Sequence, residues 1–190
     1  MLLFLVGQLS IAQIASQKKA DYYFSKFSYS LAIEEYEKMV KSDFNAEYAH
    51  QQLAECYLLI RDYKRSIPHF SAVINNATLP TDYYFKYAMA LYANGDLDES
   101  EIWLKKYKKY NKNDSRVKRF LKDGNLASVV FNSRQRYEVE PVAFNSTDSD
   151  FGTYRFMGNL YFGSSRRDVV TGESYGWNDE PWLDLFAVQE

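Results

Sequence analysis

A spacing of 34 residues recurs through the first two thirds of this chain and limits what it can fold into. Small side chains follow the spacing in two sets, which are Ala20, Ala54 and Ala88, and then Ala32, Ser66 and Ser100. Bulky side chains keep the same register in three sets, which are Tyr23, Tyr57 and Leu91, then Tyr29, Tyr63 and Leu97, and then Tyr36, Phe70 and Leu104. A fixed period of this length indicates one structural unit repeated three times.

Each unit is predicted to be a pair of helices. Apolar residues within a unit recur at helical spacings of three and four, and turns such as "IRDYKR" and "NGDLDE" separate the two halves. A small side chain on each helix allows close crossing, and the neighbouring bulky side chain fills the remaining space. Because one hairpin cannot bury its apolar face alone, we expect the three hairpins to stack.

The repeats resemble the tetratricopeptide repeat (TPR). The resemblance is carried by "ADYYFSKFSYSLAIEEYEKMV", "LAECYLLIRDYKRSIPHFSAVI" and "AMALYANGDLDESEIWLKKY", although the usual proline after the second helix is absent and only Pro80 comes close. One more short helix is expected in "SRVKRFLKDG", with Asp114 as its N-cap and Gly124 as its stop. We therefore predict a mainly α protein with a TPR α-solenoid over residues 13–122, made of three helix hairpins and a capping helix.

The charge balance and the residue pattern both change near residue 123. Residues 1–122 hold 18 Lys+Arg against 14 Asp+Glu, whereas residues 123–190 hold 5 against 11. Residues 123–136 are predicted to be a linker. From residue 137 the periodicity alternates, and "YEVEPVAF", "NLYFGSSR" and "LDLFAV" are strand candidates, with a possible fourth near "GTYRFM". A small antiparallel β segment the size of one propeller blade is expected over residues 137–190.

The amino-acid sequence of this β segment resembles that of a second family. "FNSTDSDFGTYRFMGNLYFGSSRRD" and "GWNDEPWLDLFAV" are similar to the first blade of the WD-like β-propeller in exported OmpA-like proteins of Gram-negative bacteria. In that family a signal peptide, a TPR array, the propeller, a carboxypeptidase-regulatory-like β-domain and a peptidoglycan-binding OmpA-like domain follow in order, and some relatives belong to type IX secretion. The resemblance implies an N-terminal fragment, with peptidoglycan bound only through a C-terminal domain absent from this chain.

Residues 1–12 are predicted to be a signal peptide whose positively charged start is missing. The stretch "MLLFLVGQLSIAQ" is apolar and ends in small residues, which fits cleavage after Ala12, but no Lys or Arg precedes Lys18. A buried first helix is the alternative. The run is too short for a permanent anchor, so no transmembrane segment is expected in the mature chain. With export, the protein would be periplasmic and associated with the outer membrane.

Catalytic, metal-binding and cofactor-binding residues are not predicted. His50 is expected to face its own hairpin partner as a core residue, His69 to be exposed, and Cys56 to be a buried structural thiol. The "DSD" at 148–150 is interpreted as a turn rather than a calcium loop. The run "KKYKKYNKNDSRVKRFLK" holds nine basic residues and one acidic residue, but the solvated end of a solenoid explains it better than nucleic acid does.

TPR arrays commonly bind peptides on the surface lined by the first helix of each hairpin. By register, this first-helix surface comprises Asp21, Phe24, Tyr48, Gln51, Glu55, Asp82, Phe85, Met89 and Tyr92. Its acidic and aromatic character suits a basic or aromatic segment, and it lacks the Lys and Asn set with which some TPR domains clamp a carboxylate. An outside partner and the chain's own following domain fit this surface equally well.

The resulting hypothesis is a non-enzymatic protein-binding scaffold of the bacterial cell envelope, belonging to an OmpA-like peptidoglycan-associated protein. The alternative is a free-standing periplasmic TPR adaptor whose C-terminal strands cap it or pair with a partner by strand addition.

Overall fold

The computed structural model describes residues 2–122, 138–167 and 174–189, so the predicted linker at 123–136 lies outside the described residues. The chain divides into two compact units, Met1–Arg134 and Gln135–Glu190, which we call the helical unit and the strand unit. Each unit is described by itself below.

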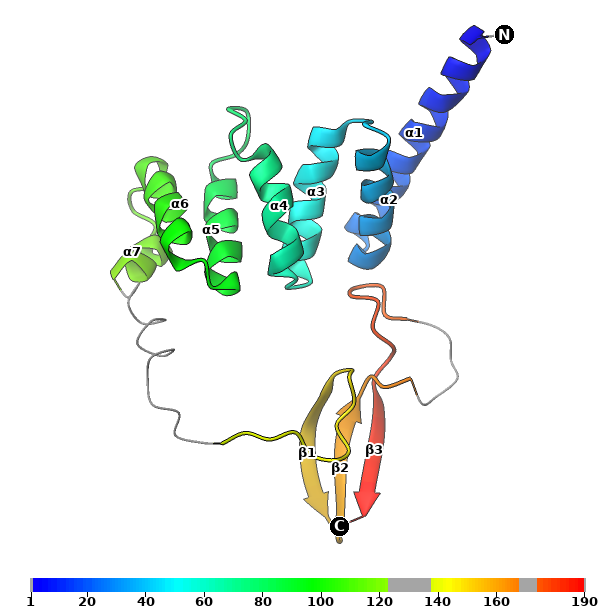
Figure 1. Cartoon of the computed structure of the whole chain (residues 1–190), viewed down its shortest axis with the longest axis vertical. Coiled ribbons are helices and arrows are strands. Elements are labelled where there is room, and N and C mark those ends of the chain that lie inside the picture. Colours follow the sequence, from blue (N-terminus) through cyan, green and yellow to red (C-terminus); the bar gives the residue numbers. More distant parts are fainter. Residues whose placement is uncertain (1, 123–137, 168–173, 190) are drawn as a thin grey trace. The chain divides into compact units, whose positions relative to one another are not determined.

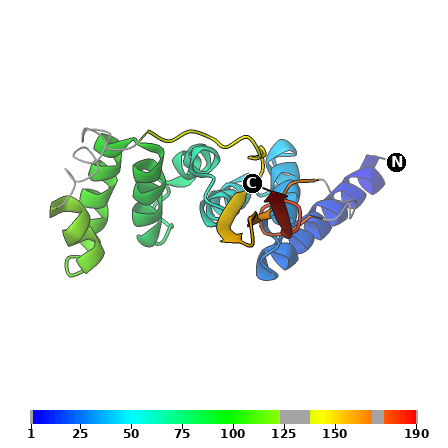
Figure 2. The same ribbon diagram turned by 90° about the horizontal axis from the view of Figure 1, so that it is seen from below.

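The helical unit is a stack of helix pairs, as predicted. Its helices are α1 (Leu2–Ser25), α2 (Tyr29–Lys41), α3 (Ala46–Leu59), α4 (Tyr63–Val73), α5 (Asp82–Asn94), α6 (Leu97–Tyr110) and α7 (Ser115–Lys122) (Figure 1). Each helix packs against the next one along the chain, and a view from below shows them following one another in a row (Figure 2). The three hairpins are therefore α1 with α2, α3 with α4, and α5 with α6, and α7 caps the last.

The positions that repeat every 34 residues form the core of this unit. All six small residues of the two sets are buried, with exposed fractions of 0 or 1%. Beside them, the bulky side chains of Tyr36, Phe70 and Leu104 are also buried. The alternation of small and bulky side chains is therefore what lets neighbouring helices pack closely, which confirms the physical interpretation of the period.

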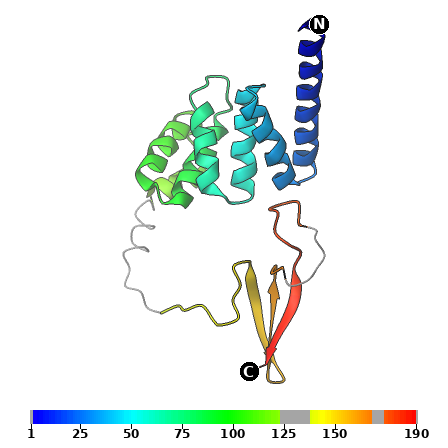
Figure 3. The same ribbon diagram turned by 45° about the vertical axis from the view of Figure 1, so that its right-hand side comes forward.

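The helix α1 is continuous from Leu2 to Ser25, and its first part extends beyond α2 (Figure 3). Its second part is tied to α2 through the buried carboxylate of Glu35, which accepts hydrogen bonds from Lys19 Nζ at 2.7 Å and Ser16 Oγ at 3.1 Å. Lys38 Nζ donates a third at 2.9 Å. Burial alone would raise the pKa of Glu35, but these hydrogen bonds outweigh it, so the pKa is lowered and the carboxylate stays charged.

No helix among the described residues is long and apolar enough to span a bilayer. Cleavage after Ala12 stays a prediction, because a continuous helix through that position neither requires nor prevents it.

The strand unit contains one antiparallel sheet in the order β1-β2-β3. Its strands are β1 (Asp150–Phe156), β2 (Asn159–Ser164) and β3 (Asp184–Gln189). A two-residue turn joins β1 to β2, with φ of 48° at Met157 and 76° at Gly158, and Phe156 pairs with Asn159 across it. Two successive positive φ values characterise the tight hairpin turn that matches strand twist, and glycine favours this conformation.

Two strand predictions need correction. Residues 138–144 of "YEVEPVAF" form no strand, because Pro141 lacks the N–H that a sheet ladder requires. The segment "GTYRFM", considered only as a possible fourth strand, contributes most of β1. The "DSD" segment was predicted to be a turn, but only Asp148 lies in a bend, and Asp150 is already the first residue of β1. The Asp150 carboxylate accepts hydrogen bonds from the backbone N–H and hydroxyl of Ser146.

One face of the sheet carries a small aromatic cluster. The ring of Phe162 lies 5.1 Å from that of Phe144 and 5.9 Å from that of Phe186. Arg166 covers this cluster, and its Nη2 donates to the carbonyl oxygen of Phe144 at 2.8 Å and to Asp150 Oδ1 at 2.9 Å. The register places Phe151, Tyr154 and Leu185 on the opposite face, where all three are exposed.

Candidate functional site

The first-helix surface begins with a shared carboxylate between the first two repeats. Tyr36 Oη on α2 and Tyr48 Oη on α3 both donate to Asp21 Oδ1, at 2.7 and 2.8 Å. Burial, followed by the hydrogen bond to Asp21, raises the pKa of both tyrosines, that of Tyr48 to about 12. The two hydroxyls therefore remain neutral donors that fix the position of Asp21 at this surface.

A second group of charges joins α3 to α5. Lys86 Nζ donates to Glu55 Oε1 at 2.5 Å and lies 3.6 Å from Asp82 Oδ2. The same ammonium stands over the ring of Tyr83, 5.3 Å from its centre. One ammonium faces two carboxylates here, and Asp21 accepts its hydrogen bonds from the neutral hydroxyls of Tyr36 and Tyr48. This part of the surface therefore carries net negative charge.

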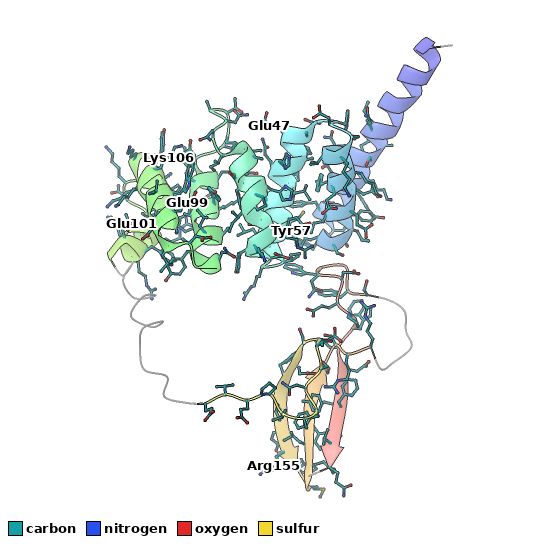
Figure 4. All side chains as sticks on the ribbon, viewed as in Figure 1. Glu47, Tyr57, Glu99, Glu101, Lys106 and Arg155 are labelled. Carbon is teal, nitrogen blue, oxygen red and sulfur yellow. The ribbon has the colours of Figure 1, made fainter. Side chains whose placement is uncertain are left out.

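Two predicted residues flank these groups. Gln51 Nε2 donates to Glu47 Oε1 at 3.5 Å on the same helix, and Glu47 also accepts a hydrogen bond from Asn76; Figure 4 labels Glu47. Phe24 is half-buried and meets the ring of Tyr29 edge-on, with 5.4 Å between ring centres. Both residues therefore lie at the border of the surface rather than in its charged centre.

The last three predicted residues pack toward the end of the solenoid. Phe85 is buried between the ring of Tyr107, 5.3 Å away, and the guanidinium of Arg116, 4.2 Å away. Met89 packs against the same cluster, and Tyr92 meets the ring of Phe120 on α7 edge-on at 5.3 Å. The capping helix thus covers much of this part, and the accessible portion lies over α1, α3 and the start of α5. The binding role of all nine residues stays a prediction.

Two residues contribute to this surface although they were not assigned to it from the sequence. Lys86 lies four residues after Asp82, a spacing that favours an ion pair on one helix face, and this signal was available. Tyr36 belongs to a second helix, α2, whereas the 34-residue register places only first helices at this surface. Its hydroxyl reaches Asp21 because the buried ring points toward α1.

The two histidines form a pair inside the second hairpin. His50 Nδ1 on α3 lies 2.8 Å from His69 Nδ1 on α4, which confirms that His50 faces its hairpin partner. His69 is half-buried and stacks on Tyr57 at 5.6 Å, so the prediction that it is exposed was wrong. Burial, followed by the proximity of His50, lowers the pKa of His69 to about 4.

Cys56 is fully buried, and burial raises the pKa of its thiol to about 12, as suits an unreactive structural residue. Within the described parts of the chain, no three His, Cys, Asp or Glu side chains are grouped to hold a metal ion.

Several basic residues of the run at the end of the solenoid form contacts within the helical unit itself. Lys106 Nζ stands over the rings of Trp103 and Tyr84, at 4.4 and 4.5 Å, and Lys105 pairs with Glu101 at 2.6 Å; Lys106 and Glu101 are labelled in Figure 4. Arg116 pairs with Asp114. These contacts favour a role in closing the solenoid.

Comparison with known proteins finds no family model and no curated protein that matches the chain. Solved structures do match. The first TPR of Spaghetti (RPAP3) bound to the HSP90 peptide SRMEEVD is 17% identical, with a TM-score of 0.51 and coverage of 62% of this chain and 93% of that chain. The C-terminal TPR-containing domain of a Plasmodium falciparum FK506-binding protein is 21% identical, with a TM-score of 0.52 and coverage of 64% and 91%. These likenesses show a TPR fold.

Proposed function

We propose that the helical unit is a non-enzymatic protein-binding scaffold whose first-helix surface takes a basic peptide segment. The observation that carries the proposal is the charge of the accessible surface, where Glu55 and Asp82 share the ammonium of Lys86 and Asp21 accepts hydrogen bonds from neutral hydroxyls. Excess carboxylates at a surface attract a cationic partner and make its binding depend on salt.

The solved TPR complex supports peptide binding as the function of this fold, but its peptide has the opposite charge from the partner proposed here. The peptide bound to Spaghetti, SRMEEVD, carries two glutamates and an aspartate against one arginine. An acidic peptide of this kind would meet like charges on the first-helix surface of the present chain, which costs binding free energy. We therefore propose a partner segment of the opposite charge.

The test begins by screening a random peptide library for binders, which we expect to be rich in lysine and arginine. Their affinity for the full chain is then measured by fluorescence anisotropy. The double variant Glu55→Gln with Asp82→Asn keeps the side-chain shapes and is expected to weaken binding about tenfold, the factor for about 1.4 kcal/mol. The matched control is Glu34→Gln with Glu101→Gln, which neutralises two exposed carboxylates on second helices.

Equal weakening by both double variants would mean that only overall charge matters, and the proposed surface would be wrong. Unchanged affinity in the Glu55 and Asp82 variant would have the same consequence. A library that yields only acidic or uncharged peptides would overturn the proposed charge preference.

For the cellular setting, we propose export to the periplasm and association with the outer membrane, as part of an OmpA-like protein. The support is the apolar start of the chain and the resemblance of residues 144–188 to a WD-like propeller blade. In that architecture, peptidoglycan is held by a separate C-terminal domain, and the TPR array organises protein partners. The alternative is a free-standing adaptor whose strands cap the array or pair with a partner.

N-terminal sequencing of the protein recovered from the periplasm of a Gram-negative host tests this setting. We expect a mature chain that begins at Gln13. A chain that retains Met1 and stays in the cytoplasmic fraction would contradict the export proposal, while leaving the peptide-binding proposal intact.

A further inference from the structure

Arginine side chains recur in this chain in one particular setting, with a carboxylate at one side and an aromatic ring below. Each case has a guanidinium about 5 Å or less from a ring centre and an ion pair to an aspartate. The three cases are Arg65 on Tyr57 with Asp62, Arg116 on Phe85 with Asp114, and Arg166 on Phe162 with Asp150.

The strand unit has a fourth setting of this kind, in which a carboxylate lies beside aromatic rings and no arginine lies there among the described residues. A cavity of about 540 Å³ is lined by residues at the start of β1 and in the loop that precedes β3. The rings of Tyr175 and Trp182 form one wall, with centres 5.2 Å apart and planes tilted by 49°. Phe151 supplies a third ring and Glu180 the carboxylate.

The cavity is built by specific contacts. The loop is closed by the backbone N–H of Tyr175, which donates to the carbonyl oxygen of Glu180 at 2.7 Å, and by a bridge between Ser174 and Pro181. The hydroxyl of Ser149 donates to the Glu180 carboxylate, with 3.2 Å to Oε2. These contacts hold the carboxylate beside the rings before any ligand arrives, which reduces the entropy lost on binding.

The charge of the cavity is not balanced by an ion pair among the described residues. Within the described residues, Glu180 forms no ion pair, and its only side-chain hydrogen bond comes from a neutral hydroxyl. The rings are available as well, because Phe151, Tyr175 and Trp182 have exposed fractions of 52, 44 and 52%. Residues 123–190 hold 5 Lys+Arg against 11 Asp+Glu, so the surrounding field also favours a cation.

We propose that this cavity binds an arginine side chain of a partner protein. The guanidinium stacks on the tilted rings and donates to the two oxygens of Glu180, as Arg116 does at Asp114. Arginine fits better than lysine because its planar fork can stack and donate at the same time, whereas an ammonium is a point charge that is more strongly hydrated. This site is independent of the first-helix surface and of the function proposed for it.

The test uses the full ¹⁵N-labelled chain and N-acetyl-L-arginine methylamide as the probe. The chain has three tryptophans, so the indole signal of Trp182 can be assigned with a Trp182→Phe variant. We expect a saturable shift of this signal with the arginine probe and a shift at least about tenfold smaller, at equal concentration, with the matching citrulline derivative, which has the same shape and no charge. The lysine derivative should bind more weakly than the arginine probe.

The variant Glu180→Gln is expected to raise the dissociation constant of the arginine probe about tenfold, whereas Glu140→Gln, which alters an exposed carboxylate outside the cavity, should leave it unchanged. Unchanged backbone signals of β1 and β2 in both variants show that the sheet is intact. Equal shifts with arginine and citrulline, or equal affinity in the Glu180→Gln variant, would overturn the proposal. The proposal would also be overturned if the wild type did not bind the probe but the double variant Arg134→Gln with Arg136→Gln did, since an arginine of the same chain would then be the occupant.

Discussion

The two units of this chain are stabilised in different ways. In the helical unit, large side chains such as Tyr36, Tyr57 and Phe70 are almost completely buried at positions set by the repeat. In the strand unit, Phe162 is the only hydrophobic residue that is buried among the described residues, and a charged side chain, Arg166, covers its cluster. Apolar packing thus stabilises the helical unit, whereas the strand unit depends on one ring cluster and its polar cover. A small sheet of this kind is marginally stable by itself.

The largest expected effect comes from removing a core ring of the helical unit. Phe70 is fully buried and packs against the rings of Tyr83 and Tyr87, so Phe70→Ala leaves a cavity and should lower the free energy of unfolding by about 3 to 5 kcal/mol. Urea denaturation followed by circular dichroism at 222 nm measures this change.

The same variant tests whether the units are independent. If they are, the backbone NMR signals of β1, β2 and β3 should keep their wild-type positions while the helical unit loses stability. If the strand signals disappear in mild urea together with those of the helices, the stability of the strand unit depends on the helical unit.

The second prediction concerns the polar cover of the strand unit. Arg166→Met keeps the length of the side chain but leaves Asp150 and the carbonyl oxygen of Phe144 without their donor. Loss of a partly buried ion pair and of the ring contact should cost about 2 to 3 kcal/mol, which is enough to unfold a marginal sheet. The rate of limited proteolysis between residues 138 and 189 reports this loss of stability. The control is Arg167→Met, which alters an exposed arginine. Equal resistance of both variants would show that packing alone sustains this unit.

Much of the helical unit could be predicted because its signal is repeated. Each helix pair places a small residue at the same two positions, and burial of all six shows that one physical requirement, close helix crossing, acts three times. The strand unit offers no such repetition. There, a single proline, Pro141, decides against one expected strand, and the positive φ of Met157 and Gly158 decides where the hairpin turns.

The candidate site was less predictable than the fold. The 34-residue register identifies which residues share a face, but it does not show what covers that face. Phe85 lies in register with Gln51, yet the capping helix and Arg116 bury it, while Gln51 remains half-exposed. The pairing of Lys86 with Glu55 links residues 31 positions apart, and only the packing of α5 beside α3 brings them together.

A third, smaller effect is expected where α1 joins the array. Glu35→Gln removes the charge that holds Lys19 and Lys38 and keeps the shape of the side chain. We expect a loss of about 1 to 2 kcal/mol in the free energy of unfolding, because the partners are solvated ammonium groups that water can satisfy. Exchange of the α1 amide hydrogens should accelerate more than exchange in α5. The exposed neighbour Glu34→Gln is the control, and an equal effect there would contradict the anchoring role of Glu35.

The smallest effect is a dependence of helical-unit stability on pH between 6.5 and 4. His69 has a folded pKa of about 4 against about 6.5 in an unfolded chain, so between these values the unfolded chain binds more protons and the free energy of unfolding falls as the pH is lowered. Protonation opposes burial and places a charge beside His50, whereas the carboxylate of Glu37 favours it.

The full shift corresponds to about 3 kcal/mol, but His69 is only half-buried, and solvent screening should reduce the observed loss to about 1 kcal/mol. The loss is measured as the difference between wild type and His69→Gln, because carboxylates that titrate in the same range contribute to both proteins and cancel. The chain has two histidines, so imidazole NMR signals provide a direct check. Titration of the His69 ring near pH 6.5 would mean that the second hairpin opens enough to hydrate it, and the tight packing attributed to the helical unit would not extend to this residue.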